Sequence, residues 1–337
     1  MAEYAGRRIA FTGPGVMAWE SFTITDDDLA PTELVVRSRT TVISPGTELA
    51  WLAGKTLDFA DAGPYQPTRP GYANIGTVLA AGSAVPARPG DRVYSMAGHG
   101  TVARVDMRDR LCVPVPDGLA DEDAVFARLA TVSMTTLLTT IARGGDAVAV
   151  VGLGLVGNLA AQVFGRCGMA VSAIDRAPER RAIAALCGLQ NVYESAEDER
   201  LSRRHRLVIE ATGSARALAS AVGLAASGGE IVMIGAPWDG AANSVPSGQL
   251  TGEIFLRFLR LRSGSEWEIP RQPQPLIHGS IQENSAVALD WLARGELHAG
   301  PLITHRLPAT EAAAAYEGLR TRPADYLGVV LDWNGVE

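Results

Sequence analysis

Lysine is nearly missing from this chain of 337 residues: Lys55 is the only one, and all other residues with a fixed positive charge are arginine. Acidic residues outnumber basic ones by 37 to 30, which gives a formal net charge of −7. Proteins that bind nucleic acid without sequence preference need a basic surface. The charge balance therefore predicts no nucleic-acid partner.

Cysteines and secretory features are scarce as well. The three cysteines, Cys112, Cys167 and Cys187, are too few and too scattered for a disulfide framework. The chain starts with polar residues, and no apolar segment of the secretory-signal type follows them. The most apolar window, residues 147–164, approaches the length of a membrane span, but its glycines and its strand-to-helix change indicate a buried folding unit. These absences predict a cytoplasmic protein with no membrane partner.

Two kinds of sequence pattern alternate along the chain. Residues 8–115 consist of short alternating runs broken by glycine and proline, which predicts a β-rich domain. A helical stretch at 121–140 then precedes a regular alternation of strands and helices, which produces a doubly wound parallel sheet in an α/β protein. The predicted strands of this sheet are 147–151, 170–174, 191–193, 206–210, 229–234 and 258–262, and the predicted helices are 155–167, 178–187 and 214–226.

The last part of the chain is predicted to return to the first domain. It contains helices at 285–294 and 310–320 and a closing strand at 327–333, which we expect to join the sheet of the β-rich domain. The predicted division is therefore 1–121 for the first domain, 122–265 for the α/β domain and 266–337 for the returning part.

A glycine turn lies between the first predicted strand of the α/β domain and its helix. It reads Gly152-Leu153-Gly154-Leu155-Val156-Gly157, and such a turn lets the backbone and the helix N-terminus approach a pyrophosphate. Asp175 ends the next strand, at the position where a carboxylate binds the ribose hydroxyls of NAD. The adjacent Arg176 either covers the 2′-phosphate of NADP or stacks on adenine, so NAD is favoured over NADP without excluding it.

The fourth and fifth strands of the predicted sheet also end in small residues. Residues at these carboxyl ends line the ligand crevice of a doubly wound sheet, although helix capping and turn formation explain the glycines almost as well. The predicted cofactor-binding residues here are Ala211, Thr212, Gly213, Ile234 and Gly235.

Taken together, the chain resembles the medium-chain dehydrogenase/reductase superfamily over nearly its full length. The motifs that carry the resemblance are Gly71 with Gly76, Pro89-Gly90-Asp91-Arg92-Val93, the glycine turn at 152–157, Glu210-Ala211-Thr212-Gly213 and Pro301-Leu302-Ile303-Thr304-His305-Arg306. The resemblance implies a GroES-like catalytic domain made from both chain ends and a central Rossmann domain, with hydride transfer at a nicotinamide in the cleft between them. It also implies a homodimer that pairs the last Rossmann strand, at 258–262.

The residues that bind zinc in the related alcohol dehydrogenases are missing. Pro45 stands where those enzymes carry a cysteine, in Pro45-Gly46-Thr47-Glu48, and Tyr72 stands in place of their histidine ligand. The region of the third ligand, 127–131, has neither cysteine nor carboxylate, and the four-cysteine lobe of a structural zinc is absent. A catalytic zinc site needs three protein ligands of these types, so no metal is predicted.

Two short motifs, residues 44–49 and 70–76, resemble a narrower branch of the superfamily. That branch includes the bacteriochlorophyllide hydroxyethyl dehydrogenases together with sugar and secondary-metabolite oxidoreductases. Because its members differ in substrate, the resemblance implies a small-molecule substrate but no pigment.

Without a metal, side chains must stabilise the reacting oxygen and move its proton. Tyr72 is the first candidate, and Lys55 is the candidate cation that lowers its pKa, because a phenol of pKa about 10 is a poor base at neutral pH. Thr47 matches the hydroxyl that relays protons in the zinc enzymes, and Glu48 matches the carboxylate behind their metal ligands and is expected to orient Tyr72. His99 follows in a glycine-flanked loop, and histidine is the residue type whose unperturbed side chain titrates near neutral pH, which suits acid–base catalysis. The structural alternatives are a packed core phenol for Tyr72 and turn or solvated loop residues for the others.

Arg128 lies in the region of the missing third ligand. Either it pairs with a carboxylate of the fold or it faces an anionic group of the substrate, and the sequence does not decide between these roles.

Three functions fit these features. The leading hypothesis is a zinc-independent, NAD-dependent dehydrogenase that interconverts a secondary alcohol and a ketone, with Tyr72 or His99 handling the proton. The second is an enoyl or quinone reductase on the same scaffold, which needs less acid–base chemistry. The third is a dinucleotide-binding sensor without catalytic activity. Fold alone does not separate them, because function depends on the site.

Overall fold

The computed structural model describes residues 2–55, 66–238 and 247–336, which divide between two compact units. The first unit comprises Met1–Arg128, Ile269–Gly295 and Ile303–Glu337, and the second comprises Leu129–Glu268 and Glu296–Leu302. The observed division differs from the predicted one by a few residues at each boundary. It also assigns the short segment Glu296–Leu302 to the second unit, whereas the sequence placed it in the returning part.

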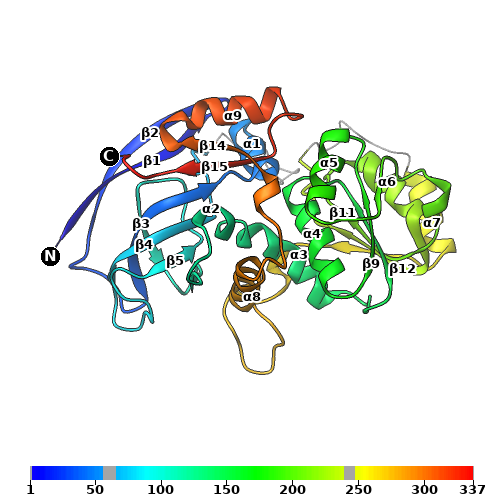
Figure 1. Ribbon diagram of the computed structural model, residues 1–337, viewed down its shortest axis with the longest axis horizontal. Coiled ribbons are helices and arrows are strands. Elements are labelled where there is room, and N and C mark those ends of the chain that lie inside the picture. Colours follow the sequence, from blue (N-terminus) through cyan, green and yellow to red (C-terminus); the bar gives the residue numbers. More distant parts are fainter. Residues whose placement is uncertain (1, 56–65, 239–246, 337) are drawn as a thin grey trace. The chain divides into compact units, whose positions relative to one another are not determined.

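The second unit combines a sheet with helices (Figure 1). The sheet is parallel and has six strands in the order β10-β9-β8-β11-β12-β13. Numbered along this unit, the order is 3-2-1-4-5-6, which is that of a doubly wound dinucleotide-binding sheet. The strands are β8 (Ala147–Val151), β9 (Ala170–Ile174), β10 (Val192–Tyr193), β11 (His205–Glu210), β12 (Ala225–Met233) and β13 (Arg260–Ser263). The predicted α/β class and sheet are therefore confirmed.

Among the helices of this unit, α4 is rich in small and apolar residues. Most of α4 is buried, from Leu155 to Phe164, because its alanines and glycines let the backbone lie close to the sheet. The helices are α3 (Ala127–Thr139), α4 (Leu155–Arg166), α5 (Pro178–Leu186), α6 (Ala215–Leu224) and α7 (Ser247–Leu256), with the short turns η1 (Glu199–Leu201), η3 (Glu266–Glu268) and η4 (Gly300–Leu302).

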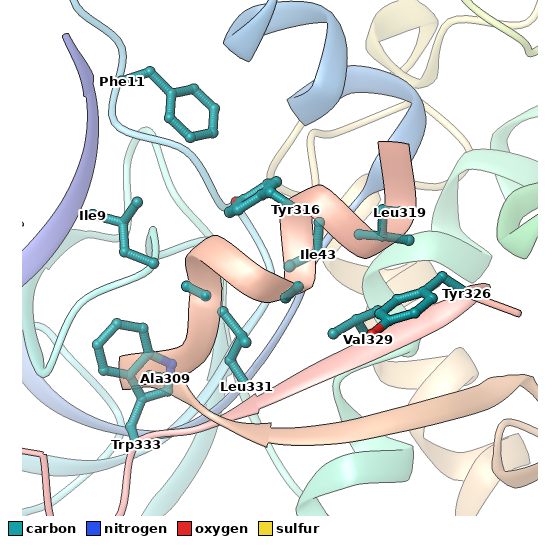
Figure 2. Packing of buried hydrophobic residues seen from close by; sticks show 12 residues of the cluster. Ile9, Phe11, Ile43, Ala309, Tyr316, Leu319, Tyr326, Val329, Leu331 and Trp333 are labelled. Atoms are coloured by element: carbon teal, nitrogen blue, oxygen red, sulfur yellow. The ribbon is translucent and has the colours of Figure 1, made fainter. Parts of the chain in front are cut away.

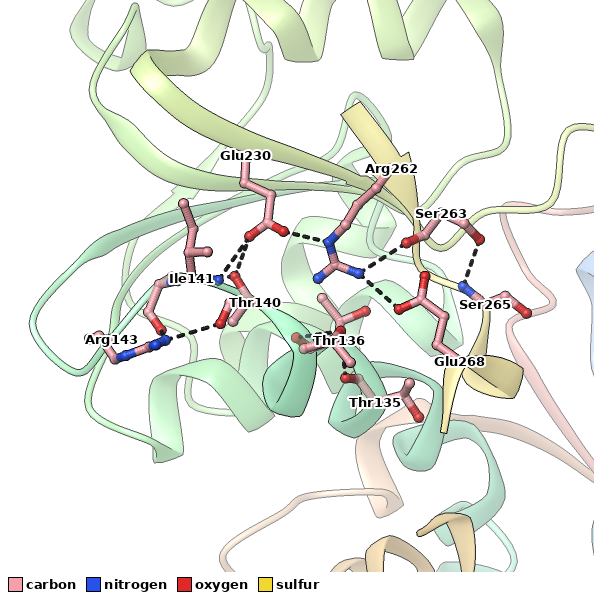
Figure 3. A network of polar contacts seen from close by, with 12 residues as sticks. Thr135, Thr136, Thr140, Ile141, Arg143, Glu230, Arg262, Ser263, Ser265 and Glu268 are labelled. Atoms are coloured by element: carbon pink, nitrogen blue, oxygen red, sulfur yellow. Dashed lines mark hydrogen bonds and ion pairs between the residues drawn. The ribbon is translucent and has the colours of Figure 1, made fainter. Parts of the chain in front are cut away.

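A buried carboxylate joins the edge strand of this sheet to the segment after α3 (Figure 3). Glu230 on β12 is 2% exposed and accepts hydrogen bonds from the Thr140 hydroxyl, the Ile141 backbone N–H and the Arg262 guanidinium. Arg262 on β13 also pairs with Glu268. Since a buried charge is tolerated only when it is paired and hydrogen-bonded, this network fixes the position of β13 beside β12.

The first unit contains a sheet of seven strands and a separate ribbon of two. The sheet order is β14-β15-β3-β4-β5-β7, with β6 paired to β3, and the ribbon pairs β1 with β2. The strands are β1 (Glu3–Gly13), β2 (Val16–Thr25), β3 (Glu33–Val42), β4 (Asn74–Ala81), β5 (Arg92–Ser95), β6 (Val102–Asp106), β7 (Cys112–Pro114), β14 (Ile303–Pro308) and β15 (Gly328–Asp332). Because β15 pairs antiparallel with β3, the predicted return of the closing strand to this sheet is confirmed.

Short helices complete the first unit: α1 (Pro45–Leu52), α2 (Asp121–Ala124), α8 (Ile281–Ala293), η5 (Ala309–Glu311) and α9 (Ala312–Thr321). The single helix predicted at 121–140 is two helices, since α2 and α3 are separated by a turn at Val125 and Phe126. Both turn residues are fully buried, so the apolar pattern continues through the turn and hides the break from the sequence.

The core of the first unit packs α9 against the strands β1 and β15 (Figure 2). Phe11 meets Tyr316 edge to face with ring centroids 5.3 Å apart, and Trp333 lies in the same cluster. These residues come from both ends of the chain, which explains why the closing segment belongs to this unit. Among the described residues, no helix combines the length and the apolar character needed to cross a membrane.

Candidate active site

The three glycines of the turn after β8 meet different surroundings. A methyl group on Gly157 would lie 1.8 Å from the carbonyl oxygen of Gly152, and one on Gly152 would lie 2.5 Å from the Thr212 methyl group. Gly152 also has a φ of +92°, which favours glycine. A methyl group on Gly154, in contrast, would meet nothing within 4 Å. The fold itself therefore requires Gly152 and Gly157, whereas Gly154 leaves open space at the turn.

The helix α4 begins directly at this open space. Its N-cap is Gly154, which has no side chain to cap the first backbone N–H groups. Such N–H groups and the positive end of the helix dipole attract anions. Leu155 and Val156 form the first helical residues, so this turn is suited to hold the diphosphate of a dinucleotide.

Asp175 lies at the end of β9, next to the glycine turn. Its carboxylate accepts the Leu153 N–H at 2.7 Å and the Ala177 N–H at 2.8 Å. Arg176 is exposed beside it. Arg180 was not singled out from the sequence; burial lowers the pKa of its guanidinium, while the charge of Asp175 acts in the opposite direction. Asp175 thus keeps the place predicted for a ribose-binding carboxylate.

The ends of β11 and β12 pack directly against the glycine turn. Glu210 is 2% exposed and accepts hydrogen bonds from the backbone N–H groups of Thr212 and Gly213. Burial raises the pKa of the Glu210 carboxyl. Gly235 has no room for a side chain because a methyl group would lie 2.2 Å from the Gly213 nitrogen. Ala211 and Ile234 continue the strands into these turns, so all five predicted residues lie at the same carboxyl edge as the glycine turn.

In the first unit, Tyr72 lies among two hydroxyl groups, a ring and a cation. We call this group the Tyr72 cluster; its members are Ser44, Thr47, Trp51, Tyr72 and Arg128. The Tyr72 hydroxyl hydrogen-bonds the Ser44 hydroxyl at 2.5 Å, and Thr47 contributes a second hydrogen bond. The Trp51 and Tyr72 rings pack edge to face with their centroids 6.2 Å apart. The Arg128 guanidinium lies 4.9 Å from the Tyr72 ring centroid.

The electrostatics of Tyr72 differ from the sequence expectation. Burial raises the pKa of Tyr72, Glu48 raises it further, and Arg128 acts in the opposite direction. The phenol is therefore protonated at neutral pH. Lys55 is exposed beyond the end of α1, and the cation against the phenol is Arg128 instead.

A second polar group, which we call the His99 cluster, is buried in the first unit. Its members are Thr41, Glu48, His99, Tyr316 and Trp333. The His99 ring nitrogens contact the Thr41 hydroxyl at 2.8 Å and the Glu48 carboxylate at 2.9 Å. Glu48 also accepts the Tyr316 hydroxyl and the Ser44 backbone N–H. His99 is 1% exposed and Glu48 is fully buried.

These contacts change the roles predicted for Glu48 and His99. The sequence suggested that Glu48 orients Tyr72, but Glu48 does not hydrogen-bond that residue. Its partners are His99, Tyr316 and the backbone of Ser44. His99 is not a solvated loop residue either, because both of its ring nitrogens are engaged inside the unit. The sequence could not reveal this pairing, since Glu48 and His99 are 51 residues apart.

The residues present do not fit a catalytic zinc ion. Pro45, Tyr72 and Arg128 stand at or near the positions that hold ligands in the zinc enzymes, and none of these side chains is a usual zinc ligand. Throughout 2–55, 66–238 and 247–336, no three His, Cys, Asp or Glu side chains gather closely enough to hold a metal ion.

Comparison with known proteins places this geometry in a family. The family model of zinc-binding dehydrogenases matches residues 155–263. The 2-desacetyl-2-hydroxyethyl bacteriochlorophyllide A dehydrogenase of Cereibacter sphaeroides is 30% identical over 326 residues, which cover 92% of this chain and 93% of the relative. The chain belongs to the medium-chain dehydrogenase/reductase superfamily. It is accordingly an oxidoreductase of the medium-chain type that acts on alcohols, as that relationship predicted.

Solved structures share the fold of this medium-chain dehydrogenase at low identity. L-idonate 5-dehydrogenase from Escherichia coli K-12 has a TM-score of 0.80 at 17% identity and covers 98% of this chain and 99% of its own. An alcohol dehydrogenase from Escherichia coli CFT073, complexed with NADH, has a TM-score of 0.76 at 19% identity, with 97% and 99% covered. A protein described as a zinc-binding dehydrogenase from Sinorhizobium meliloti, bound to NADP, has a TM-score of 0.74 at 19% identity, with 98% and 99% covered. Nicotinamide cofactors of both kinds therefore occur on this fold.

Proposed function

We propose that the protein is a zinc-independent, NAD-dependent dehydrogenase that interconverts a secondary alcohol and a ketone on a small metabolite. The substrate class follows the relative from Cereibacter sphaeroides, whose name specifies a hydroxyethyl group. At 30% identity the proposal extends to the secondary alcohol and not to the pigment that carries it.

The observation that carries this proposal is the Tyr72 cluster. Where the zinc enzymes hold a metal ion against the reacting oxygen, this chain has a phenol that is hydrogen-bonded to the Ser44 and Thr47 hydroxyls. Hydrogen-bond donors aimed at a developing oxyanion stabilise it in the transition state. Tyr72 therefore takes the role that the metal has in those relatives, with Ser44 and Thr47 passing the proton onward.

Burial and the nearby Glu48 raise the pKa of Tyr72, and this sets how the phenol works. A protonated phenol donates a proton to the oxygen of a ketone during reduction and accepts one from the alcohol during oxidation once it is ionised. Bound NAD supplies the other half of the reaction by exchanging a hydride with the carbinol carbon. Reduction is accordingly the direction that needs no prior ionisation of Tyr72 at neutral pH.

We assign supporting roles to His99 and Glu48. Both are buried, and Glu48 accepts the Ser44 backbone N–H at 2.8 Å. The pair thereby fixes the start of α1 and the position of the Ser44 hydroxyl. His99 acts through Glu48 and α1 and does not itself touch the substrate, which makes it a positioning residue.

The cofactor preference rests on Asp175. Its carboxylate at the end of β9 repels a 2′-phosphate and suits the ribose hydroxyls of NAD. Arg176 and Arg180 flank it and reduce the discrimination against NADP.

The Tyr72→Phe variant tests the proposal, with purified protein, NAD(H), NADP(H) and panels of secondary alcohols, ketones and enones. Loss of the phenol proton is expected to lower kcat/KM by about a hundredfold or more, while NADH binding stays unchanged. Tyr4→Phe, in the ribbon, is the control and keeps its activity. Wild-type kcat/KM in Tyr72→Phe contradicts the assignment. Turnover of enones alone identifies a reductase, and tight NADH binding without turnover identifies a sensor.

We also propose a homodimer that pairs β13 of two copies. This strand is at the edge of its sheet, and Phe255, Leu256 and Phe258 just before it are 81%, 74% and 79% exposed. Large exposed apolar groups next to an unpaired strand edge favour association. Light scattering is expected to give twice the mass of 35.5 kDa, and Phe258→Asp is expected to return the protein to a monomer. A wild-type monomer at micromolar concentration contradicts this arrangement.

A further inference from the structure

Arg128 is a buried cation in contact with the ring of Tyr72. It is 3% exposed, and its guanidinium carbon lies 4.9 Å from the ring centroid. A guanidinium over an aromatic face is attracted by the ring, more strongly when water is excluded. The two residues come from distant segments, the start of α3 and the turn before β4. The fold therefore brings a permanent positive charge to the phenol.

The charges that face the Tyr72 oxygen have opposite effects on it. Glu48 and burial raise the pKa of Tyr72, and Arg128 lowers it. Tyr316 and His99 hydrogen-bond Glu48, so they act on the phenol through that carboxylate. The Ser44 and Thr47 hydroxyls stabilise the ionised form by hydrogen bonding. Arg128 is thus a cation whose effect on the Tyr72 phenol opposes that of the Glu48 carboxylate.

We propose that Arg128 is the electrostatic activator of Tyr72 and that its buried charge over the ring stabilises the ionised phenol that accepts the proton of an alcohol. The inference rests on the proposed function. It adds a role for Arg128 to the two that the sequence left open, which were pairing with a carboxylate of the fold and facing an anionic group of the substrate.

The proton step balances without any further reactant. During oxidation the O–H bond of the alcohol breaks and its proton passes to the ionised Tyr72 oxygen, while the C–H bond breaks and its electron pair leaves as hydride to the nicotinamide of NAD. The carbonyl bond forms, and the neutral phenol then returns its proton to solvent through the Ser44 hydroxyl. Arg128 stabilises the negative charge that Tyr72 carries before it accepts the proton.

The test is a double-mutant cycle of Arg128→Met and Tyr72→Phe, assayed as alcohol oxidation with NAD over a range of pH. The probe is the secondary alcohol that the wild type turns over fastest in the panel. In the wild type, kcat/KM is expected to rise toward alkaline pH. Arg128→Met is expected to move this rise upward by about one pH unit and to lower kcat/KM at neutral pH by about tenfold. In the Tyr72→Phe background the same change is expected to alter kcat/KM less than about twofold.

Three outcomes overturn the inference. A loss by the same factor at every pH and in both backgrounds shows that Arg128 only supports the fold. An increase in KM with an unchanged pH profile shows that it binds an anionic group of the substrate. An unmoved profile with unchanged rates shows that it has no role. Arg128→Lys, which keeps the charge, is expected to restore most of the wild-type profile.

Failure of this inference is distinguishable from failure of the proposed function. If Tyr72→Phe alone keeps wild-type activity, the proposed function is wrong. If Tyr72→Phe is inactive but Arg128→Met keeps the wild-type profile, only the role of Arg128 is wrong. Circular dichroism and urea unfolding check the folding of each variant, and Arg128→Gln, which also removes the charge, replaces Arg128→Met in the cycle if the methionine variant does not fold.

Discussion

The Tyr72 cluster and the His99 cluster each place a phenol beside the same carboxylate, yet the two phenols differ in every other contact. Tyr316 is 2% exposed, and its hydroxyl donates a hydrogen bond directly to Glu48. Tyr72 is half-buried, hydrogen-bonds hydroxyl groups and has a cation over its ring. Burial raises the pKa of both phenols, but Glu48 holds the proton on Tyr316 while Arg128 favours its loss from Tyr72.

This difference separates a group that can exchange a proton from one that cannot. An acid–base catalyst needs access to its substrate and a stabilised ionised form. Of the two phenols, Tyr72 is the more exposed and has a cation over its ring. Tyr316 and His99 use their hydrogen-bonding capacity to satisfy a buried carboxylate, because an unpaired one would be very costly. We therefore expect changes in the His99 cluster to affect stability first and changes in the Tyr72 cluster to affect catalysis first.

The largest expected effect on stability is that of Glu48→Gln. An amide cannot accept hydrogen bonds from Tyr316, His99 and the Ser44 N–H together, so the free energy of unfolding is expected to fall by about 3 kcal/mol. Glu122→Gln is the matched control, because Glu122 pairs with Arg306 at the surface, where a pair is worth about 0–1 kcal/mol. Urea unfolding followed by circular dichroism measures both. Equal losses in the two variants would mean that the buried carboxylate contributes no more than a surface one.

The sequence predicted the nucleotide-binding part of the fold more closely than the rest. The strands β8 and β9 have the predicted bounds, because each is a short, largely apolar run that ends at a glycine or an aspartate. The strand β12 begins at Ala225, four residues before the predicted start at 229. Its first residues, alanine, serine and glycine, have low strand propensity, so their pairing beside β11 depends on neighbours that local sequence does not reveal.

The candidate site in the first unit was predicted only in part. Tyr72 and Thr47 were identified because they stand in motifs that the zinc enzymes share. The contacts that decide their chemistry join distant segments: Arg128 reaches Tyr72 from α3, and Tyr316 reaches Glu48 across 268 residues. Ser44 was visible next to Pro45 but had no predicted role, since only the fold shows that it faces the phenol.

The smallest expected effect, and the most specific for the comparison, is that of Tyr316→Phe. The variant removes one hydrogen bond to a buried carboxylate, which is expected to cost about 1.5 kcal/mol at neutral pH, with kcat/KM within about threefold of the wild type because Tyr316 does not exchange protons with the substrate.

Alkaline pH sharpens this prediction. Burial and Glu48 raise the pKa of Tyr316 well above its ordinary value of 10.0, so the folded wild type keeps a proton that the unfolded chain loses. This stabilisation is fully present below the ordinary pKa and is lost as the pH rises through it toward the folded pKa. The stability difference between wild type and Tyr316→Phe is therefore expected to narrow above pH 10.0, as measured by urea midpoints at neutral and alkaline pH. A difference that stays constant would mean that Tyr316 ionises as readily in the folded protein as in the unfolded chain, and the contrast between the two phenols would then have to come from solvent access alone.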